Sequence, residues 1–157
     1  MDSMAKLTVA IIGIIGFLAF VLMQSQLDTP AANYVEVTPA IDGDVLILTG
    51  ECRAVNMTVS DHQAISIASA MAKKFYVRPM TQDIMKDIFD AYGIRLASAR
   101  IDGISDGIYT ARMVVTTGGK TLEMDSRPTD AVGMAIRMGV PVLFEEKLLE
   151  AGGEKIC

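Results

Sequence analysis

The pattern of hydrophobic and polar positions divides the chain into an apolar N-terminal segment and a longer part with mixed periodicity. Residues Leu7–Met23 are almost continuously apolar, and no charge occurs between Lys6 and Asp28. As a helix, residues 7–27 span about 31 Å, close to a hydrocarbon thickness of about 30 Å. We therefore predict a membrane anchor at residues 1–27 that contacts the lipid bilayer through residues 7–27. The alternatives are a cleaved signal peptide and a buried core helix.

The charges that flank this segment predict its orientation. Lys6 and the amino terminus precede it, whereas Asp28 and Glu36 are the first charges after it. The positive-inside rule then places the N-terminus in the cytoplasm. We expect a single-pass membrane protein whose folded domain is extracytoplasmic.

The rest of the chain divides into a linker at residues 28–33, one domain at residues 34–152 and a tail at residues 153–157. Alternating apolar residues predict seven strands, which lie at Tyr34–Val37, Val45–Thr49, Ala54–Val59, Arg95–Ile101, Gly107–Thr116, Lys120–Met124 and Val142–Phe144. The predicted connections are Asp42-Gly43-Asp44 in the first group and Asp102-Gly103, Asp106-Gly107 and Gly118-Gly119 in the second. An antiparallel start and a later meander follow from these short connections.

Apolar residues at helical spacing predict the helices. One runs from about Asp61 to Lys73, with Ser60 and Gln63 as a capping box. A second is capped by Thr81 and ended by Gly93, a third lies between Pro128 and Gly139, and a short fourth covers Glu145–Ala151. Strands and helices come in blocks, so the predicted fold class is α+β, a mostly antiparallel sheet with three to four helices, preceded by a single N-terminal transmembrane helix.

Composition and charge narrow the function classes. The 157 residues are 51% hydrophobic and 21% charged, which excludes a disordered chain. The net charge of −5 excludes a wholly basic nucleic-acid-binding surface, but not a local basic patch. Cys52 and Cys157 lack metal-ligand spacing, so neither a disulfide framework nor a zinc site is expected.

Two helix starts carry the candidate chemistry. The first, Asp125–Asp130, follows a strand, and its Asp125 and Asp130 are candidate ligands for Mg²⁺ or Mn²⁺ while Arg127 meets a phosphate. The second, Arg78–Asp83, has the same composition. If the two junctions lie side by side, Arg78 and Arg127 form a cationic site flanked by acids. The alternative interpretation is two ordinary helix starts, with Asp125 or Ser126 as a cap.

These assignments give a candidate residue set. The catalytic candidates are Asp125, Arg127 and Asp130, the substrate-binding candidates are Arg78, Thr81 and Asp83, and the metal candidates are Asp125 and Asp130. His62, the single histidine, lies on the first turn of its helix and is interpreted as a solvent-facing bystander. Lys73 and Lys74 are interpreted as a solvated helix end.

Three segments resemble the bifunctional nuclease domain family. They are Leu122–Val132 followed by Gly139–Val142, Met57–Val59 leading into Gln63–Ala68, and Arg78–Asp83, and the resemblance covers about Tyr34 to Leu149. It implies an α+β domain that is often oligomeric, with plant members described as acting on RNA and DNA. Members commonly have a histidine where this chain has Gln82, and an acid near His62 or Gln63.

Two function classes follow from these observations. The first is a membrane-anchored nuclease that hydrolyses phosphodiester bonds of RNA or DNA with Mg²⁺ or Mn²⁺. The second is a non-catalytic membrane-tethered module for self-assembly into a homo-oligomer or for ligand binding. Binding of a small anion at the two arginines is intermediate between them.

Overall fold

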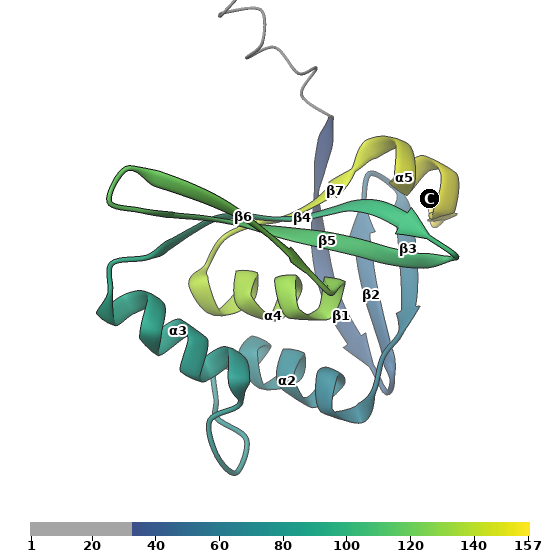
Figure 1. The fold of residues 1–157 in the computed structure, drawn as a ribbon. Helices are drawn as coiled ribbons and strands as arrows, with labels where there is room; N and C mark the ends of the chain where they lie inside the picture. The colour runs from purple at the N-terminus through teal and green to yellow at the C-terminus, as the bar shows by residue number, and fades with distance from the viewer. Residues whose placement is uncertain (1–32) are drawn as a thin grey trace, which may run out of the picture. The chain divides into compact units, whose positions relative to one another are not determined.

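The computed structural model describes residues 33–157, which form a unit distinct from residues 1–32. Eight strands make one sheet in the order β6-β5-β4-β7-β1-β2-β3-β8 (Figure 1). The predicted anchor and all but the last residue of the predicted linker lie outside the described residues. No helix within residues 33–157 is long and apolar enough to cross a membrane.

The predicted antiparallel start is confirmed by β1 (Tyr34–Asp42), β2 (Val45–Gly50) and β3 (Arg53–Thr58). β1 is longer than predicted and continues through Pro39. It pairs with β7 (Val142–Glu145) over Tyr34–Val37 and with β2 only from Thr38 onwards. Pro39 therefore has a sheet neighbour on one side alone, and its missing N–H costs no ladder hydrogen bond on the other side.

The predicted meander is confirmed by β4 (Arg95–Ser105), β5 (Ile108–Thr117) and β6 (Lys120–Ser126). The turn predicted at Asp102-Gly103 is wrong, because these residues continue β4 past a register shift between Ile101 and Gly103. The chain reverses at Asp106-Gly107 and at Gly118-Gly119, where all four residues have positive φ. One pair, β4 with β7, is parallel, so the sheet is mostly antiparallel as predicted.

Three helices lie on one side of the sheet (Figure 1). α4 (Pro128–Met138) contacts β4, β5 and β7, and α2 (Asp61–Met71) and α3 (Thr81–Ala91) pack on α4. α5 (Glu146–Gly152) lies apart from them and contacts β3, β4 and β7. The core lies between these layers, and its largest fully buried side chains include Leu46, Leu48, Ile67, Ile101, Met134 and Phe144.

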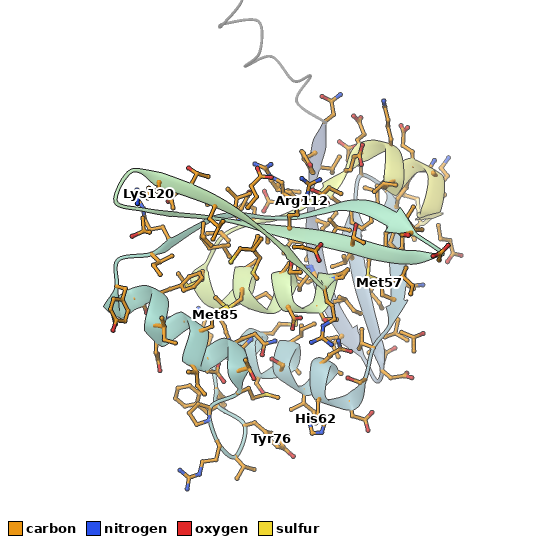
Figure 2. The ribbon with its side chains drawn as sticks, viewed as in Figure 1. Met57, His62, Tyr76, Met85, Arg112 and Lys120 are labelled. Atoms are coloured by element: carbon orange, nitrogen blue, oxygen red, sulfur yellow. A yellow bond between two sulfur atoms is a disulfide. The ribbon has the colours of Figure 1, made fainter. Side chains whose placement is uncertain are left out.

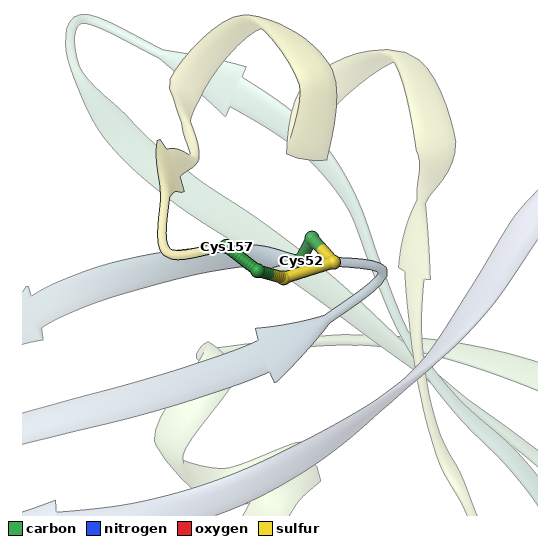
Figure 3. The surroundings of a disulfide bond; sticks show 2 residues. All are labelled: Cys52 and Cys157. Carbon is green, nitrogen blue, oxygen red and sulfur yellow. A yellow bond between two sulfur atoms is a disulfide. The ribbon is translucent and has the colours of Figure 1, made fainter.

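The C-terminal segment, predicted as a tail, holds a short strand and a disulfide. β8 (Glu154–Lys155) pairs with β3, and the Cys52 and Cys157 sulfurs are bonded across the turn that follows β2 (Figure 3). This bridge was not predicted from the sequence, where Cys52 and Cys157 were not expected to form a disulfide framework. A single bridge forms because β8 carries the last residue back to the β2–β3 turn.

Candidate functional site

The two helix starts singled out in the sequence lie side by side. α4 begins after its N-cap Arg127, with Pro128 as the first helical residue, and α3 begins after its N-cap Met80. The Gln82 side-chain amide donates a hydrogen bond of 2.9 Å to Asp130 Oδ1, which joins the two starts directly. The predicted capping residues are wrong in detail, because Asp125, Ser126 and Thr81 do not occupy the N-cap positions.

A cavity of about 650 Å³, called here the site cavity, opens between these helix starts, the start of α2 and the end of β6. Its polar lining comes from all four elements. The residues are Ser60, His62, Gln63, Ser66, Thr81, Gln82, Asp125, Ser126, Arg127 and Asp130, with Met80, Met85, Met113 and Met134 as the apolar part.

Arg127 and Asp130 form the charged pair at the site cavity. Arg127 Nε lies 2.9 Å from Asp130 Oδ2, and the Arg127 side chain is 74% exposed. The hydrogen bond to Asp130 uses Arg127 Nε. The two terminal nitrogens, Nη1 and Nη2, have no hydrogen-bond partner among the described residues. Two such nitrogens of one guanidinium can donate hydrogen bonds to a phosphate in bidentate fashion.

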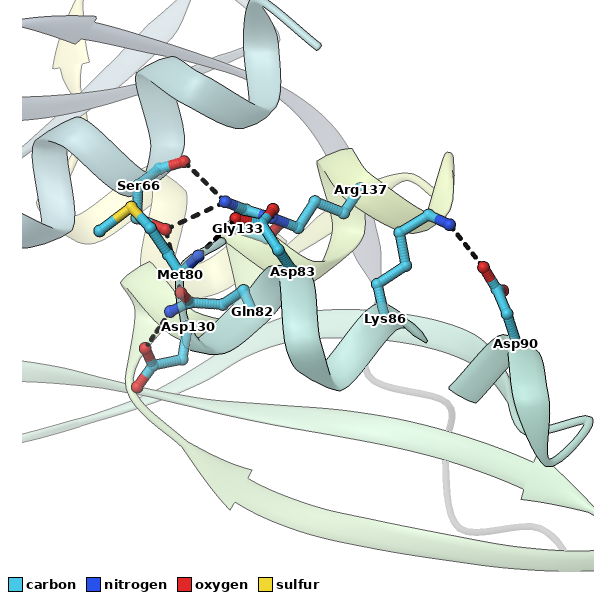
Figure 4. A network of polar contacts seen from close by, with 9 residues as sticks. All are labelled: Ser66, Met80, Gln82, Asp83, Lys86, Asp90, Asp130, Gly133 and Arg137. Atoms are coloured by element: carbon cyan, nitrogen blue, oxygen red, sulfur yellow. Dashed lines mark hydrogen bonds and ion pairs between the residues drawn. The ribbon is translucent and has the colours of Figure 1, made fainter. Parts of the chain in front are cut away.

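A chain of hydrogen bonds runs from this pair into the interior (Figure 4). Gln82 bridges α4 and α2, since its amide donates to Asp130 and its Oε1 accepts from Ser66 Oγ at 3.0 Å. Arg137 then donates to the Ser66 carbonyl oxygen at 3.1 Å and to Gly133 O at 3.1 Å. The position of Asp130 in the cavity is thereby tied to the packing of three helices.

The network ends at a buried ion pair. Arg137 Nε lies 2.6 Å from Asp83 Oδ1, and the two side chains are 4% and 11% exposed. Asp83 Oδ2 also accepts a hydrogen bond of 2.7 Å from the backbone N–H of Met80, the N-cap residue of α3. Burial alone raises the pKa of Asp83, but the hydrogen bonds from Arg137 and Met80 and the Arg137 charge outweigh it, so the pKa lies below its usual range.

The structure separates the predicted site residues into two groups. Asp125, Arg127, Asp130 and Thr81 line the site cavity. Arg78 and Asp83 do not: Asp83 is the partner of Arg137, and Arg78 is exposed in the loop before α3.

Several lining residues were given no role in the site by sequence reasoning. His62, interpreted from the sequence as a bystander, is one of the residues that line the site cavity. It lies at the start of α2 (Figure 2). Gln63 accepts from the Ser60 amide, as the predicted capping box requires, and also donates to Thr129 Oγ1 at 3.0 Å. Ser126 Oγ is buried and has no hydrogen-bond partner among the described residues.

The described residues contain no group of three or more His, Cys, Asp or Glu placed to hold a metal ion. Asp125 and Asp130 are the acids that line the site cavity, and both oxygens of Asp130 already accept hydrogen bonds. This donor set does not make a protein-only metal cage. It fits an ion such as Mg²⁺ that keeps its waters and takes one or two carboxylates together with a substrate phosphate.

Comparison with known proteins identifies relatives of the domain. Residues 45–156 match the family model of the bifunctional nuclease domain. An uncharacterised protein of Mycobacterium tuberculosis strain H37Rv is 29% identical over 101 residues, which cover 64% of this chain and 60% of that protein. Bifunctional nuclease 2 of Oryza sativa subsp. japonica is 24% identical over 98 residues, covering 60% of this chain and 30% of the rice protein.

A longer alignment joins the chain to a second rice protein. Bifunctional nuclease 1 of Oryza sativa subsp. indica is 22% identical over 134 residues, covering 83% of this chain and 38% of its own length. The chain thus spans 60% of the length of the mycobacterial relative and less than two fifths of the rice proteins.

Proposed function

The chain belongs to the bifunctional nuclease domain family, and on this premise we propose that it is a membrane-anchored nuclease that hydrolyses phosphodiester bonds of RNA or DNA in the site cavity. The observation that carries the proposal is the Arg127 guanidinium. It is anchored to Asp130 through one nitrogen and keeps its two terminal nitrogens available beside a cavity lined by His62 and Asp125.

Each residue has a chemical role in this proposal. Arg127 binds the scissile phosphate and stabilises the charge that develops on it. His62, which lines the same cavity, is the candidate for proton transfer, because an imidazole can serve as a general acid or base. Ser126 Oγ offers a hydrogen bond that no described residue uses.

Asp125 and Asp130 are the residues that would hold Mg²⁺ or Mn²⁺. Such an ion would supply positive charge at the substrate phosphate, which the acidic chain otherwise provides only through its arginines and lysines. Thr81 also lines the site cavity and is the residue of the α3 start proposed to contact the substrate.

The extracytoplasmic location is also part of the proposal. Disulfides persist in oxidising compartments and are rare in the cytosol. The bond between Cys52 and Cys157 therefore supports the orientation inferred from the charges around residues 7–27.

The alternative function is a non-catalytic, membrane-tethered module for oligomerisation or ligand binding. Two observations favour it. Both oxygens of Asp130 serve hydrogen bonds that hold helices together, which is an architectural use of the residue. Ile84 and Ile88 are 52% and 48% exposed one turn apart on α3, which suits contact with a second copy.

A cleavage assay distinguishes the two functions. We expect the purified chain to cleave single-stranded RNA or DNA with Mg²⁺ or Mn²⁺ and to lose this activity in EDTA. Arg127→Ala and Asp125→Ala should each abolish most cleavage, while both variants keep the thermal stability of the parent. The matched control is Lys147→Ala, which removes an exposed cation from α5, away from the site cavity. Equal activity of all variants would indicate a contaminating nuclease, and no cleavage by a folded chain would favour the binding module.

A further inference from the structure

The loop between α2 and α3, residues 72–80, exposes aromatic and basic side chains together. Phe75, Tyr76 and Val77 are 65%, 59% and 80% exposed. Lys73 and Lys74 precede them and Arg78 follows, and no acidic residue occurs within residues 72–80. We call residues 73–78 the basic aromatic loop. It projects from the helical side of the domain, with Tyr76 near its tip (Figure 2).

The cations of this loop have no acidic partner among the described residues. None of Lys73, Lys74 and Arg78 takes part in an ion pair between described residues, whereas the nearby Lys86 pairs with Asp90. Lys73, Lys74 and Phe75 border a hollow of about 340 Å³ together with Asp83 and Asp87. Asp83 is already committed to Arg137, so Asp87 is the remaining acid at this hollow beside Lys73 and Lys74.

We propose that the basic aromatic loop binds an unstacked single strand of nucleic acid, with bases stacked on Phe75 and Tyr76 and phosphates held by Lys73, Lys74 and Arg78. Proteins that bind single strands combine cations that follow the backbone with aromatic rings on which bases stack. Bases in a duplex are not available to stack on Phe75 and Tyr76, because they are already paired and stacked on one another. The proposal rests on the proposed nuclease function and specifies its substrate as single-stranded.

The loop leads directly into the site cavity. Met80 and Thr81, which follow Arg78 and Pro79, are themselves part of the cavity lining. In the proposed binding mode, a strand held by the loop passes Thr81 and reaches Arg127, which lines the same cavity. Arg78 thereby has a substrate-binding position without lying in the site cavity.

A second copy of the chain fits the loop less well. A symmetric contact between two copies would place three cations against three cations, which is unfavourable. A bilayer carrying anionic lipid is the other occupant that the test below distinguishes.

The test measures binding separately from cleavage. Fluorescence anisotropy of labelled oligo(dT) and of a labelled DNA duplex is recorded with the full chain in EDTA. Phe75→Ala/Tyr76→Ala is expected to weaken oligo(dT) binding by about tenfold or more, since base stacking on one ring contributes about 1–3 kcal/mol. Duplex binding should change little. Tyr92→Ala is the matched control, because Tyr92 is 75% exposed at the end of α3.

The cations are tested through the salt dependence. Lys73→Gln/Lys74→Gln should reduce the slope of log affinity against log salt by about one to two, roughly 0.7 per phosphate contact for a single strand. Lys120→Gln, at the start of β6 and distant from the loop, should leave the slope unchanged (Figure 2).

The outcomes separate this proposal from the nuclease proposal. Cleavage by the parent chain with unchanged oligo(dT) affinity in Phe75→Ala/Tyr76→Ala would overturn the loop proposal and leave the nuclease intact. Loop-dependent oligo(dT) binding without any cleavage would support the loop and overturn the nuclease. Binding of vesicles containing anionic lipid that depends on Phe75 and Tyr76, with no oligo(dT) binding, would assign the loop to a membrane instead.

Discussion

Breaking the disulfide between Cys52 and Cys157 should destabilise the domain strongly. The bond joins residues 105 positions apart, so it closes a loop that contains every described element except β1 and β2. In the chain-entropy account, a crosslink of this span lowers the entropy of the unfolded chain by about 16 cal/mol/K, or about 4.7 kcal/mol at 25 °C. Domains of this size have a stability of about 5–15 kcal/mol. The reduced domain should therefore be only marginally folded at the lower end of that range.

Contacts other than the disulfide hold the C-terminal segment in the folded state. The tail stays in place without the bond, because Ala54 and Glu154 remain paired across β3 and β8 and Ile156 N donates to Cys52 O at 2.9 Å. Arg53 Nη1 also donates to Gly153 O at 2.9 Å. We therefore expect reduction to leave the folded geometry largely unchanged. Its main effect is to raise the entropy of the unfolded chain.

The assay is urea unfolding of residues 33–157 followed by far-ultraviolet circular dichroism, since the chain has no tryptophan. Adding reductant to the parent and introducing the double substitution Cys52→Ser/Cys157→Ser should each lower the free energy of unfolding by the same amount. Reductant should not change the free energy of unfolding of the double variant. A loss below about 1 kcal/mol in both cases would refute the loop-entropy reasoning. A loss in reductant alone would point to an effect unrelated to the bond.

Four further predictions concern the network and the helix ends. Arg137→Met leaves Asp83 buried without its partner and should cost about 3–5 kcal/mol in urea unfolding, most of it recovered in Arg137→Met/Asp83→Leu. Because the pKa of Asp83 is lowered on folding, its contribution is full above the ordinary aspartate pKa of about 3.9 and is lost as the pH falls through the folded pKa; Asp83→Asn should flatten that part of an acid unfolding curve. Gly139→Ala should cost roughly 1–2 kcal/mol, read as a lower Tm, since φ is +68° with open space around the added methyl. Asp125→Ala should change the free energy of unfolding by less than about 0.5 kcal/mol, because Asp125 is exposed and the N-cap is Arg127; a loss of about 1 kcal/mol would restore it as a cap.

Local signals in the sequence predicted most of the fold. Pro128 and Gly139 bound α4, and the glycine pairs mark the meander turns, because each residue has a backbone conformation that suits its place. The missed features depend on distant partners. Asp102-Gly103 has turn chemistry but is held in β4 by pairing across the bulge to β5, and β8 exists only because β3 lies beside it.

The candidate site was predicted in composition but not in connectivity. The similarity of the two helix starts led to Asp125, Arg127, Asp130 and Thr81, which share one cavity. Asp83 was grouped with them because it is the acid on the first turn of the second helix start, yet its carboxylate pairs with the buried Arg137. Arg137 gave one signal that could have found this pair, an arginine within the apolar α4, which calls for a buried partner.

The network makes substitutions at the site cavity unequal as tests of function. Asp130 and Gln82 are linked through Ser66 to the Arg137–Asp83 pair, so removing either leaves partly buried groups unsatisfied. A loss of activity in Asp130→Ala would therefore include a loss of stability. Arg127 and Asp125 lie on the exposed side, and their removal leaves the buried part of the network complete. Loss of cleavage in these two variants at unchanged stability is consequently the observation that separates a catalytic role from an architectural one.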